Sequence, residues 1–181
     1  MRPFRVVAPQ GTLVPIEDLR DHVRADTGEQ DLRLASFERA AVAYLDGYTG
    51  RLGRCILRQK WAQPLNGTEK LVDLPFPDCR EFSVEQRDSE GAWSEVANVT
   101  VTVVDDCALL EGLPLDQSGI HLMFWAGWDT PDEVPENLKQ AVFLLATHWN
   151  DNRSAINHSG ANSELPYGVE TMLQPFVQVF G

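Results

Sequence analysis

The residues of this chain that could carry chemistry are four histidines, three cysteines and two pairs of adjacent acids. The histidines and cysteines are His22, His121, His148, His158, Cys55, Cys79 and Cys107. A zinc site needs several of these side chains to converge, usually with short spacings such as Cys-x-x-Cys. All the spacings here are long, and the cysteine count is odd. We therefore expect no metal, no cofactor and no disulfide framework, and the simplest account is three thiols in a reducing cytosol.

No motif of a known catalytic type is present. The chain lacks Gly-x-Ser-x-Gly, a phosphate-binding GxxxxGK[ST], His-Glu-x-x-His and GxGxxG. Cys107 follows Asp105 and Asp106, and neighbouring carboxylates raise the pKa of a thiol and make it a weaker nucleophile. Asp105-Asp106 and Asp132-Glu133 could hold a divalent cation, although paired acids beside a turn are usually only solvated. We therefore expect no hydrolase, nuclease or nucleotide-binding activity, and no enzyme.

The charge balance limits the partners of the chain. Fifteen Lys and Arg against 27 Asp and Glu give a net charge of -12, which opposes non-specific DNA binding because that binding depends on cations at the phosphates. The same charge suits a passage through which DNA slides without being held. Residues 51–68 are basic, whereas residues 131–181 carry six acids. Such a charge pattern is usually only a solvated surface, and contact with another subunit or a partner is the alternative interpretation.

The elements expected from the sequence place this chain in the α+β class. Its 181 residues suit one domain with an insertion, and no apolar run has the length of a membrane span or a secretion signal. Apolar periodicity predicts helices at about 15–25, 31–48, 135–152 and 166–174. Short alternating segments separated by turn residues predict five to seven strands at about 54–127, beginning with a strand at 54–61, as a small antiparallel sandwich or barrel.

The helix expected at 135–152 has more apolar surface than one core-facing stripe needs. Leu138, Ala141, Val142, Leu145 and Trp149 would share one face, about 100° wide. The remaining apolar side chains, Phe143, Leu144 and Ala146, fall largely outside that stripe. Two interpretations remain open: a central helix buried within its own domain, or a helix with one face on its core and another on a neighbouring subunit.

The C-terminal stretch after the polar loop at 150–163 is short and apolar. Pro166 and Pro175 limit regular helix, and the final FVQVFG alternates like an extended strand. A segment of this length cannot pack alone, so it covers the chain's own core or docks on a partner.

Three segments in order resemble the head–tail connector (adaptor) proteins of long-tailed bacteriophages and of related prophage-derived particles such as gene transfer agents. They are AAVAYLDGYTGRLGRCILRQKW, AGWDTPDEVPENLKQAVFLLATHWNDNRSA and LPYGVETMLQPF. With the opening helix they span most of the chain beyond residue 12. Each motif alone is weak, and three in order around a β insertion are fairly specific. The sequence departs from the pattern at Val177, where relatives often carry arginine, and at Asn150, where an aromatic is common.

The resemblance implies a single connector domain that forms a ring, dodecameric in that family, under the portal protein. Such a ring extends the DNA channel and meets a stopper or other tail-side neck protein, in a virion neck assembled in the bacterial cytoplasm. DNA would pass through without specific binding, and no membrane is involved. The helical part would make the subunit contacts, and the tail would engage the portal. The candidate interface residues are Arg51, Arg54, Phe143, Leu144, Trp149, Arg153, Pro166, Tyr167, Phe176 and Phe180.

Two other functions remain open on the sequence. One is a different neck or tail protein, such as a stopper or tail-completion protein. The two helices before the β insertion count against this alternative. The other is a β-rich module that binds a small ligand, with Trp93, Trp125 or Trp128 as stacking surfaces.

Overall fold

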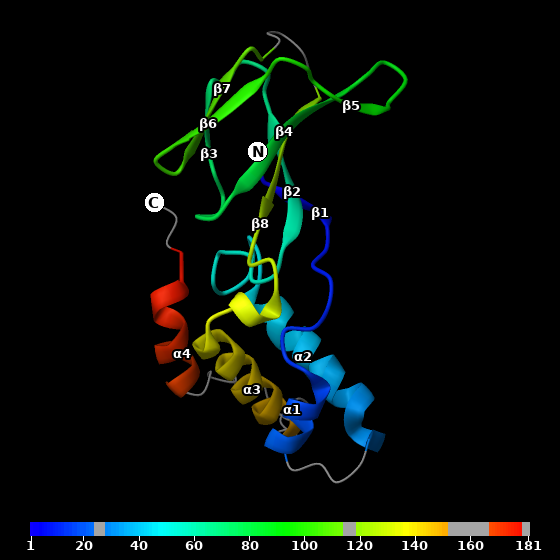
Figure 1. Cartoon of the computed structure of the whole chain (residues 1–181), viewed down its shortest axis with the longest axis vertical. Coiled ribbons are helices and arrows are strands. Elements are labelled where there is room, and N and C mark those ends of the chain that lie inside the picture. The colour runs from blue at the N-terminus through cyan, green and yellow to red at the C-terminus, as the bar shows by residue number, and fades with distance from the viewer. Residues whose placement is uncertain (24–27, 114–118, 152–166, 179–181) are drawn as a thin grey trace, which may run out of the picture. The chain divides into compact units, whose positions relative to one another are not determined.

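The computed structural model describes residues 1–23, 28–113, 119–151 and 167–178, and Figure 1 shows the elements that these residues form. The chain divides into two compact units. The β unit comprises Met1–Gln10 and Arg58–Gly127, and the helical unit comprises Gly11–Leu57 and Trp128–Gly181. Helices together with antiparallel sheets confirm the α+β class.

The helical unit contains four α-helices within the described residues. They are α1 (Ile16–His22), α2 (Asp31–Leu45), α3 (Glu136–Asp151) and α4 (Tyr167–Leu173), with 3-10 turns at Gly28–Gln30, Pro131–Glu133 and Gln174–Phe176. Helix α3 packs against both α2 and α4 and lies between them (Figure 1). Helix α2 ends three residues earlier than expected because Asp46 adopts an extended conformation, with ψ of 145°. Within the described residues, no helix combines the length and the apolarity that crossing a bilayer requires.

The core of the helical unit is built around α3. Its buried residues are Leu138, Ala141, Val142, Leu145 and Ala146. Ala41 and Leu45 from α2 and Val169 and Leu173 from α4 belong to the same buried cluster. Buried apolar side chains of this size stabilise a fold by roughly 2 kcal/mol each, so the cluster supplies most of the driving force for this unit.

The segment after α2 is held tightly to the helix end. The Asp46 carboxylate accepts the backbone N–H of Ile56 at 2.7 Å, and the Arg51 N–H donates to the carbonyl of Tyr44 at 2.9 Å. A Cβ at Gly50 would lie 2.2 Å from the carbonyl oxygen of Asp46. Only glycine fits there, which gives a physical reason for Gly50 in the segment AAVAYLDGYTGRLGRCILRQKW.

The β unit contains two antiparallel sheets. The five-stranded sheet has the order β1-β2-β8-β4-β5, and the three-stranded sheet has the order β3-β7-β6. The strands are β1 (Phe4–Val7), β2 (Gln59–Leu65), β3 (Leu71–Asp73), β4 (Arg80–Arg87), β5 (Trp93–Glu95), β6 (Thr100–Val104), β7 (Cys107–Glu111) and β8 (Ile120–Ala126). Both sheets are open among the described residues, so neither forms a closed barrel.

Two features of the β unit differ from the sequence expectation. The strand expected at 54–61 begins only at Gln59, because Cys55, Ile56 and Leu57 are all buried in the helical unit and do not alternate. The N-terminal residues form β1, which pairs with β2 and makes the N-terminus part of the sheet. That strand was not expected, because its partner lies more than fifty residues away in the sequence.

Candidate interaction surfaces

The extra apolar side chains of α3, together with Trp149, pack largely within the helical unit. Ala146 is fully buried, and Phe143, Leu144 and Trp149 are partly buried against the core. The Phe143 ring lies 5.1 Å from the His22 ring of α1, and the Trp149 ring lies 6.4 Å from the Tyr44 ring of α2. These contacts favour the interpretation of α3 as a helix central to its own unit, and a subunit contact through the same three residues stays a prediction.

Two of the three basic candidates, Arg51 and Arg54, have a contact within the chain. An Arg51 guanidinium nitrogen lies 3.2 Å from a carboxylate oxygen of Glu170 in α4, and both side chains are about half exposed. Arg54 stacks over the Trp128 ring at 4.6 Å from its centroid. An exposed pair such as Arg51–Glu170 stabilises by at most about 1 kcal/mol. Exchange of such a partner for an acid of a neighbouring copy would therefore cost little.

The C-terminal segment is part of the helical core as far as the structure describes it. Val169 and Leu173 are buried, and Phe176 packs against the same cluster. The Gln178 N–H donates to the carbonyl of Leu52 at 2.8 Å, which fixes the chain beyond α4. Three predicted contact residues, Arg153, Pro166 and Phe180, and the Tyr167 side chain lie outside the described residues.

The exposed face of α2 is a surface that the sequence analysis missed. Leu32 is 87% exposed there, the highest exposure among the large apolar residues described. Ser36, Ala40 and Ala43 are also exposed, and they follow Leu32 at helical spacing. The signal was available in the sequence, because Leu32 falls outside the apolar stripe that Leu34, Ala41 and Leu45 define. The exposed Arg39 lies on the same face, and a single exposed leucine is common on protein surfaces, so a contact through this face is a prediction.

Two of the three cysteines, Cys79 and Cys107, have raised thiol pKa values. The Cys107 thiol donates to the Asp73 carboxylate at 3.3 Å, and this hydrogen bond is the main reason that its pKa is raised. Asp106 and Asp105 act in the expected direction but contribute less to the raised pKa. Burial raises the pKa of Cys79 to about 12. Among the described residues, no group of three or more His, Cys, Asp or Glu side chains could hold a metal ion.

The tryptophans considered as ligand platforms contact other side chains of the chain. Trp93 stacks on His121 at 4.2 Å between centroids, and Phe4 meets the same imidazole edge-on at 5.3 Å. Burial lowers the pKa of His121, and the Glu85 charge opposes this shift. Arg58 covers Trp125 at 4.5 Å from the ring centroid. Trp93 remains 42% exposed, but its stacking on His121 leaves less of its ring surface for a ligand.

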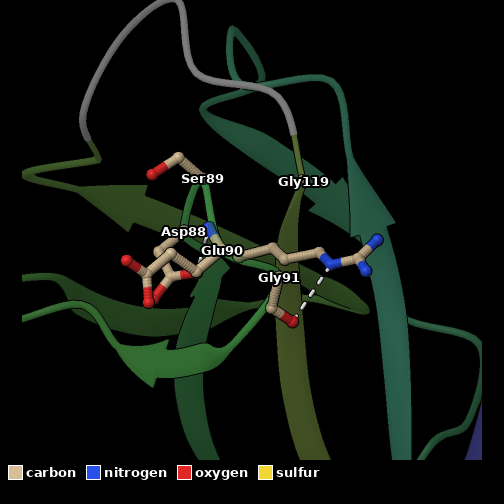
Figure 2. Close-up of a pocket in the computed structure, with 6 residues that line it drawn as sticks. Asp88, Ser89, Glu90, Gly91 and Gly119 are labelled. Carbon is tan, nitrogen blue, oxygen red and sulfur yellow. Dashed lines mark hydrogen bonds between the residues drawn. The ribbon is translucent and has the colours of Figure 1, made fainter.

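The hollow in Figure 2 lies at the turn between β4 and β5. It has a volume of about 430 Å³ and is lined by Arg87, Asp88, Ser89, Glu90, Gly91 and Gly119. The Asp88 carboxylate accepts the N–H groups of Glu90 and Ala92, at 2.9 and 2.8 Å. The Arg87 guanidinium donates to the Gly91 carbonyl at 3.2 Å, as Figure 2 shows. These polar groups hold the turn, and they do not form a nucleophile and base.

Comparison with known proteins identifies neighbours in fold along the whole chain. No protein-family model and no curated protein matches the sequence. A chain in the neck of an empty gene transfer agent particle, computed with C6 symmetry, superposes with a TM-score of 0.75 at 26% identity. A chain in the virion of a native gene transfer agent particle gives 0.74 at 27% identity, and one in the neck of a native particle, computed with C12 symmetry, gives 0.72 at 25%. Each comparison covers 100% of this chain and 97% of the other, so this chain is similar over its full length to chains of gene transfer agent particles.

Proposed function

We propose that this chain is a structural protein of the neck of a phage-like particle, and that it serves there as the adaptor between head and tail. The full-length similarity to chains from gene transfer agent necks carries the proposal. The adaptor role itself rests on the sequence motifs around the β insertion. In this role the protein is located in the virion, acts without catalysis, and joins the portal to a stopper or another tail-side protein.

The oligomer that we propose is a ring, dodecameric as in the adaptor family. The similar necks were computed with C6 and C12 symmetry, which a ring of this chain would share. Within the ring, the helical unit would supply subunit contacts through the exposed face of α2 and through Phe143, Leu144 and Trp149 of α3. The exposed part of the tail beyond α4 would meet the portal, because the apolar side of α4 is already used in the core.

Assembly on portal rings tests this proposal directly. We expect the purified chain to form rings seen by negative-stain electron microscopy when portal rings from the same particle are added. Leu32→Asp should reduce the fraction of decorated portals because it places a charge on an apolar contact, while the melting temperature stays unchanged for a side chain 87% exposed.

The matched control is Ser89→Asp, which adds the same charge at an exposed turn of the β unit. This control should decorate portals like the wild type. Undecorated portals with the wild-type chain would contradict the adaptor role. Full decoration by Leu32→Asp would exclude the α2 face as a contact and leave the adaptor role intact.

The acidic balance predicts weak DNA binding. With a net charge of -12, we expect no retention of duplex DNA in a filter-binding assay at physiological ionic strength, because few phosphates can be neutralised. The same result is expected for assembled rings. Tight and salt-sensitive binding by rings would indicate a basic channel wall and contradict this prediction.

A further inference from the structure

The three-stranded sheet leaves two strand edges unpaired among the described residues. Its order is β3-β7-β6, so β3 and β6 form the edges. Leu71 on β3 is 56% exposed, and Val103 and Val104 on β6 are each 49% exposed. Strand β6 reads Thr-Val-Thr-Val-Val, with no charge, proline or glycine. Soluble proteins usually protect such an edge with lysine, proline or a bulge, so an unprotected one indicates a pairing surface.

The hydrogen bonds to β7 show which backbone groups of β3 face outward. The Leu110 N–H donates to the carbonyl of Lys70 at 2.8 Å, and the Leu74 N–H donates to the carbonyl of Asp106 at 2.9 Å. Because hydrogen-bonded and non-bonded pairs alternate along an antiparallel ladder, the N–H and C=O groups of Val72 also point toward β7. The N–H and C=O groups of Leu71 and Asp73 therefore face away from the sheet.

The same alternation sets the outward groups of β6. The backbone N–H and C=O groups of Ala108 and Leu110 point toward β3. Those of Leu109 therefore point toward β6, where its partner is Thr102. Val101 and Val103 consequently present their N–H and C=O groups at the free edge. Each edge thus offers two residues whose backbone groups point outward at a spacing of two, which is the pattern that strand addition requires.

We propose that β6 of one copy pairs in parallel with β3 of the next copy, and that the repeated pairing forms a continuous sheet around the ring. This inference rests on the proposed function. Val103 would lie beside Val72 of the neighbouring copy. The Val103 N–H would donate to the Leu71 carbonyl, and the Val103 carbonyl would accept the Asp73 N–H. The Leu71 N–H would donate to the carbonyl of Val101.

The side-chain faces agree with this register. Val72 and Val103 both pair with Ala108, so they lie on the same face of the sheet, and Leu71 and Thr102 both pair with Leu109 on the other. The contact between β6 of one copy and β3 of the next, here called the seam, therefore joins matching faces of the two sheets. It also covers the exposed Leu71 and Val103. A slip of one residue would place side chains on the wrong face, so the register is specified.

A second copy of this chain is the occupant that the geometry favours. Both edges are antiparallel to β7 and hence parallel to each other, so a head-to-tail repeat brings β6 to β3 with the strand direction kept. Pairing of two different edges is heterologous, and such a contact closes into a ring when the rotation from copy to copy divides a full turn. The necks that contain similar chains were computed with cyclic symmetry, which is the symmetry that this contact generates.

The charges at one end make the seam weak for free copies. Asp73 of one copy would lie beside Val104 of the next, close to Asp105 and Asp106 in the turn after β6. Repulsion between these carboxylates opposes pairing in solution. The seam would therefore form only where other ring contacts already hold neighbouring copies together.

Disulfide trapping tests the register. In a Cys107→Ser background, we combine Leu71→Cys with Thr102→Cys, which the proposed seam sets side by side on one face. Neighbouring strands lie about 4.8 Å apart, within the Cα separation that a disulfide spans. In rings on portals, mild oxidation should convert the double variant into a covalent ladder up to the full ring. Either single variant should stay monomeric, and an equimolar mixture of the two should stop at dimers.

A backbone variant tests the hydrogen bonds without new cross-links. Val103→Pro removes the outward N–H and leaves the ladder to β7 intact, so the melting temperature should not change. The control Val103→Thr keeps both the N–H and the β-branched shape. We expect at least an approximately tenfold lower fraction of chains in rings for Val103→Pro than for Val103→Thr, because every seam loses a donor.

The outcomes separate this inference from the proposed function. Rings that form without disulfide-linked multimers of the double variant, or that tolerate Val103→Pro, would overturn the seam and leave the adaptor role standing. Dimers from one single variant would also overturn it, since they require a twofold contact. Absence of rings from the wild-type chain on portals would remove the proposed function and the seam together.

Discussion

Leu173→Ala is expected to lower the free energy of unfolding by about 3 kcal/mol, because it opens a cavity at a side chain that is 1% exposed. Leu173 contributes to the same buried cluster as Leu138 and Leu145 of α3. Chemical denaturation followed by far-UV circular dichroism measures the change. Deletion of residues 170–181 removes Leu173 and Phe176 together and should destabilise the helical unit further.

The control for this prediction is Val177→Ala, at a side chain that is 37% exposed. This change should cost no more than about 0.5 kcal/mol. The comparison also separates two roles of the tail. A large loss of stability for Leu173→Ala supports core packing by α4. An unchanged midpoint together with lost portal attachment would instead identify α4 as a docking element and contradict the assignment to the core.

The elements that the sequence predicted well are those whose pattern is local. Helix α3 was predicted from its crowded apolar positions, and β4 to β8 from short alternating segments between turn residues. Strand β1 has four residues, and three of them are exposed, so it carries no pattern of its own. Its existence depends on pairing with β2, a contact that local periodicity does not contain.

The strand expected at 54–61 failed for a related reason. Alternation at Cys55 and Leu57 indicates one buried face, but Ile56 between them is also fully buried. That burial comes from the helical unit, where the Ile56 N–H donates to Asp46 and its carbonyl accepts the Trp128 N–H. A short apolar run with tertiary contacts on every side cannot be told from a strand by periodicity alone.

The candidate surfaces also combine features that the local sequence pattern predicts with features that depend on tertiary contacts. The sequence predicted α3 as a helix but left open whether its extra apolar side chains pack on its own unit or on a neighbouring subunit. In the structure, His22 and Tyr44 cover part of it from two other helices. The exposed Leu32 and the edge strand β6 are better candidates for contact, because each keeps apolar surface in water after the chain has folded.

Glu38 is the other residue at which a single change should have a large effect. It lies in the middle of α2 and is only 3% exposed. Its carboxylate accepts the backbone N–H of Leu13 at 2.9 Å, and Val14 donates to it as well. Leu13 and Val14 are themselves buried in the core. Glu38→Ala would leave both N–H groups without their acceptor, and we expect a loss of about 3 kcal/mol of stability.

The pH dependence of stability gives a second measurement on the same residue. Burial raises the pKa of Glu38, and the hydrogen bonds from Leu13 and Val14 oppose the shift. A carboxyl with a raised pKa binds its proton more tightly in the folded state than in the unfolded one. Its contribution to stability is therefore greatest below its ordinary pKa and is lost as the pH rises through the folded value.

Glu38→Gln keeps an acceptor oxygen for the Leu13 N–H and removes the titration, so it is the matched variant. We expect the stability of the wild type relative to Glu38→Gln to fall as the pH is raised from 4 to 8. The difference between the two proteins cancels the titration of the other carboxylates. Urea denaturation at a series of pH values measures it. A difference that grows with pH would mean that the hydrogen bonds from Leu13 and Val14 outweigh burial, and a flat difference would mean that the two effects balance; either result would contradict the prediction.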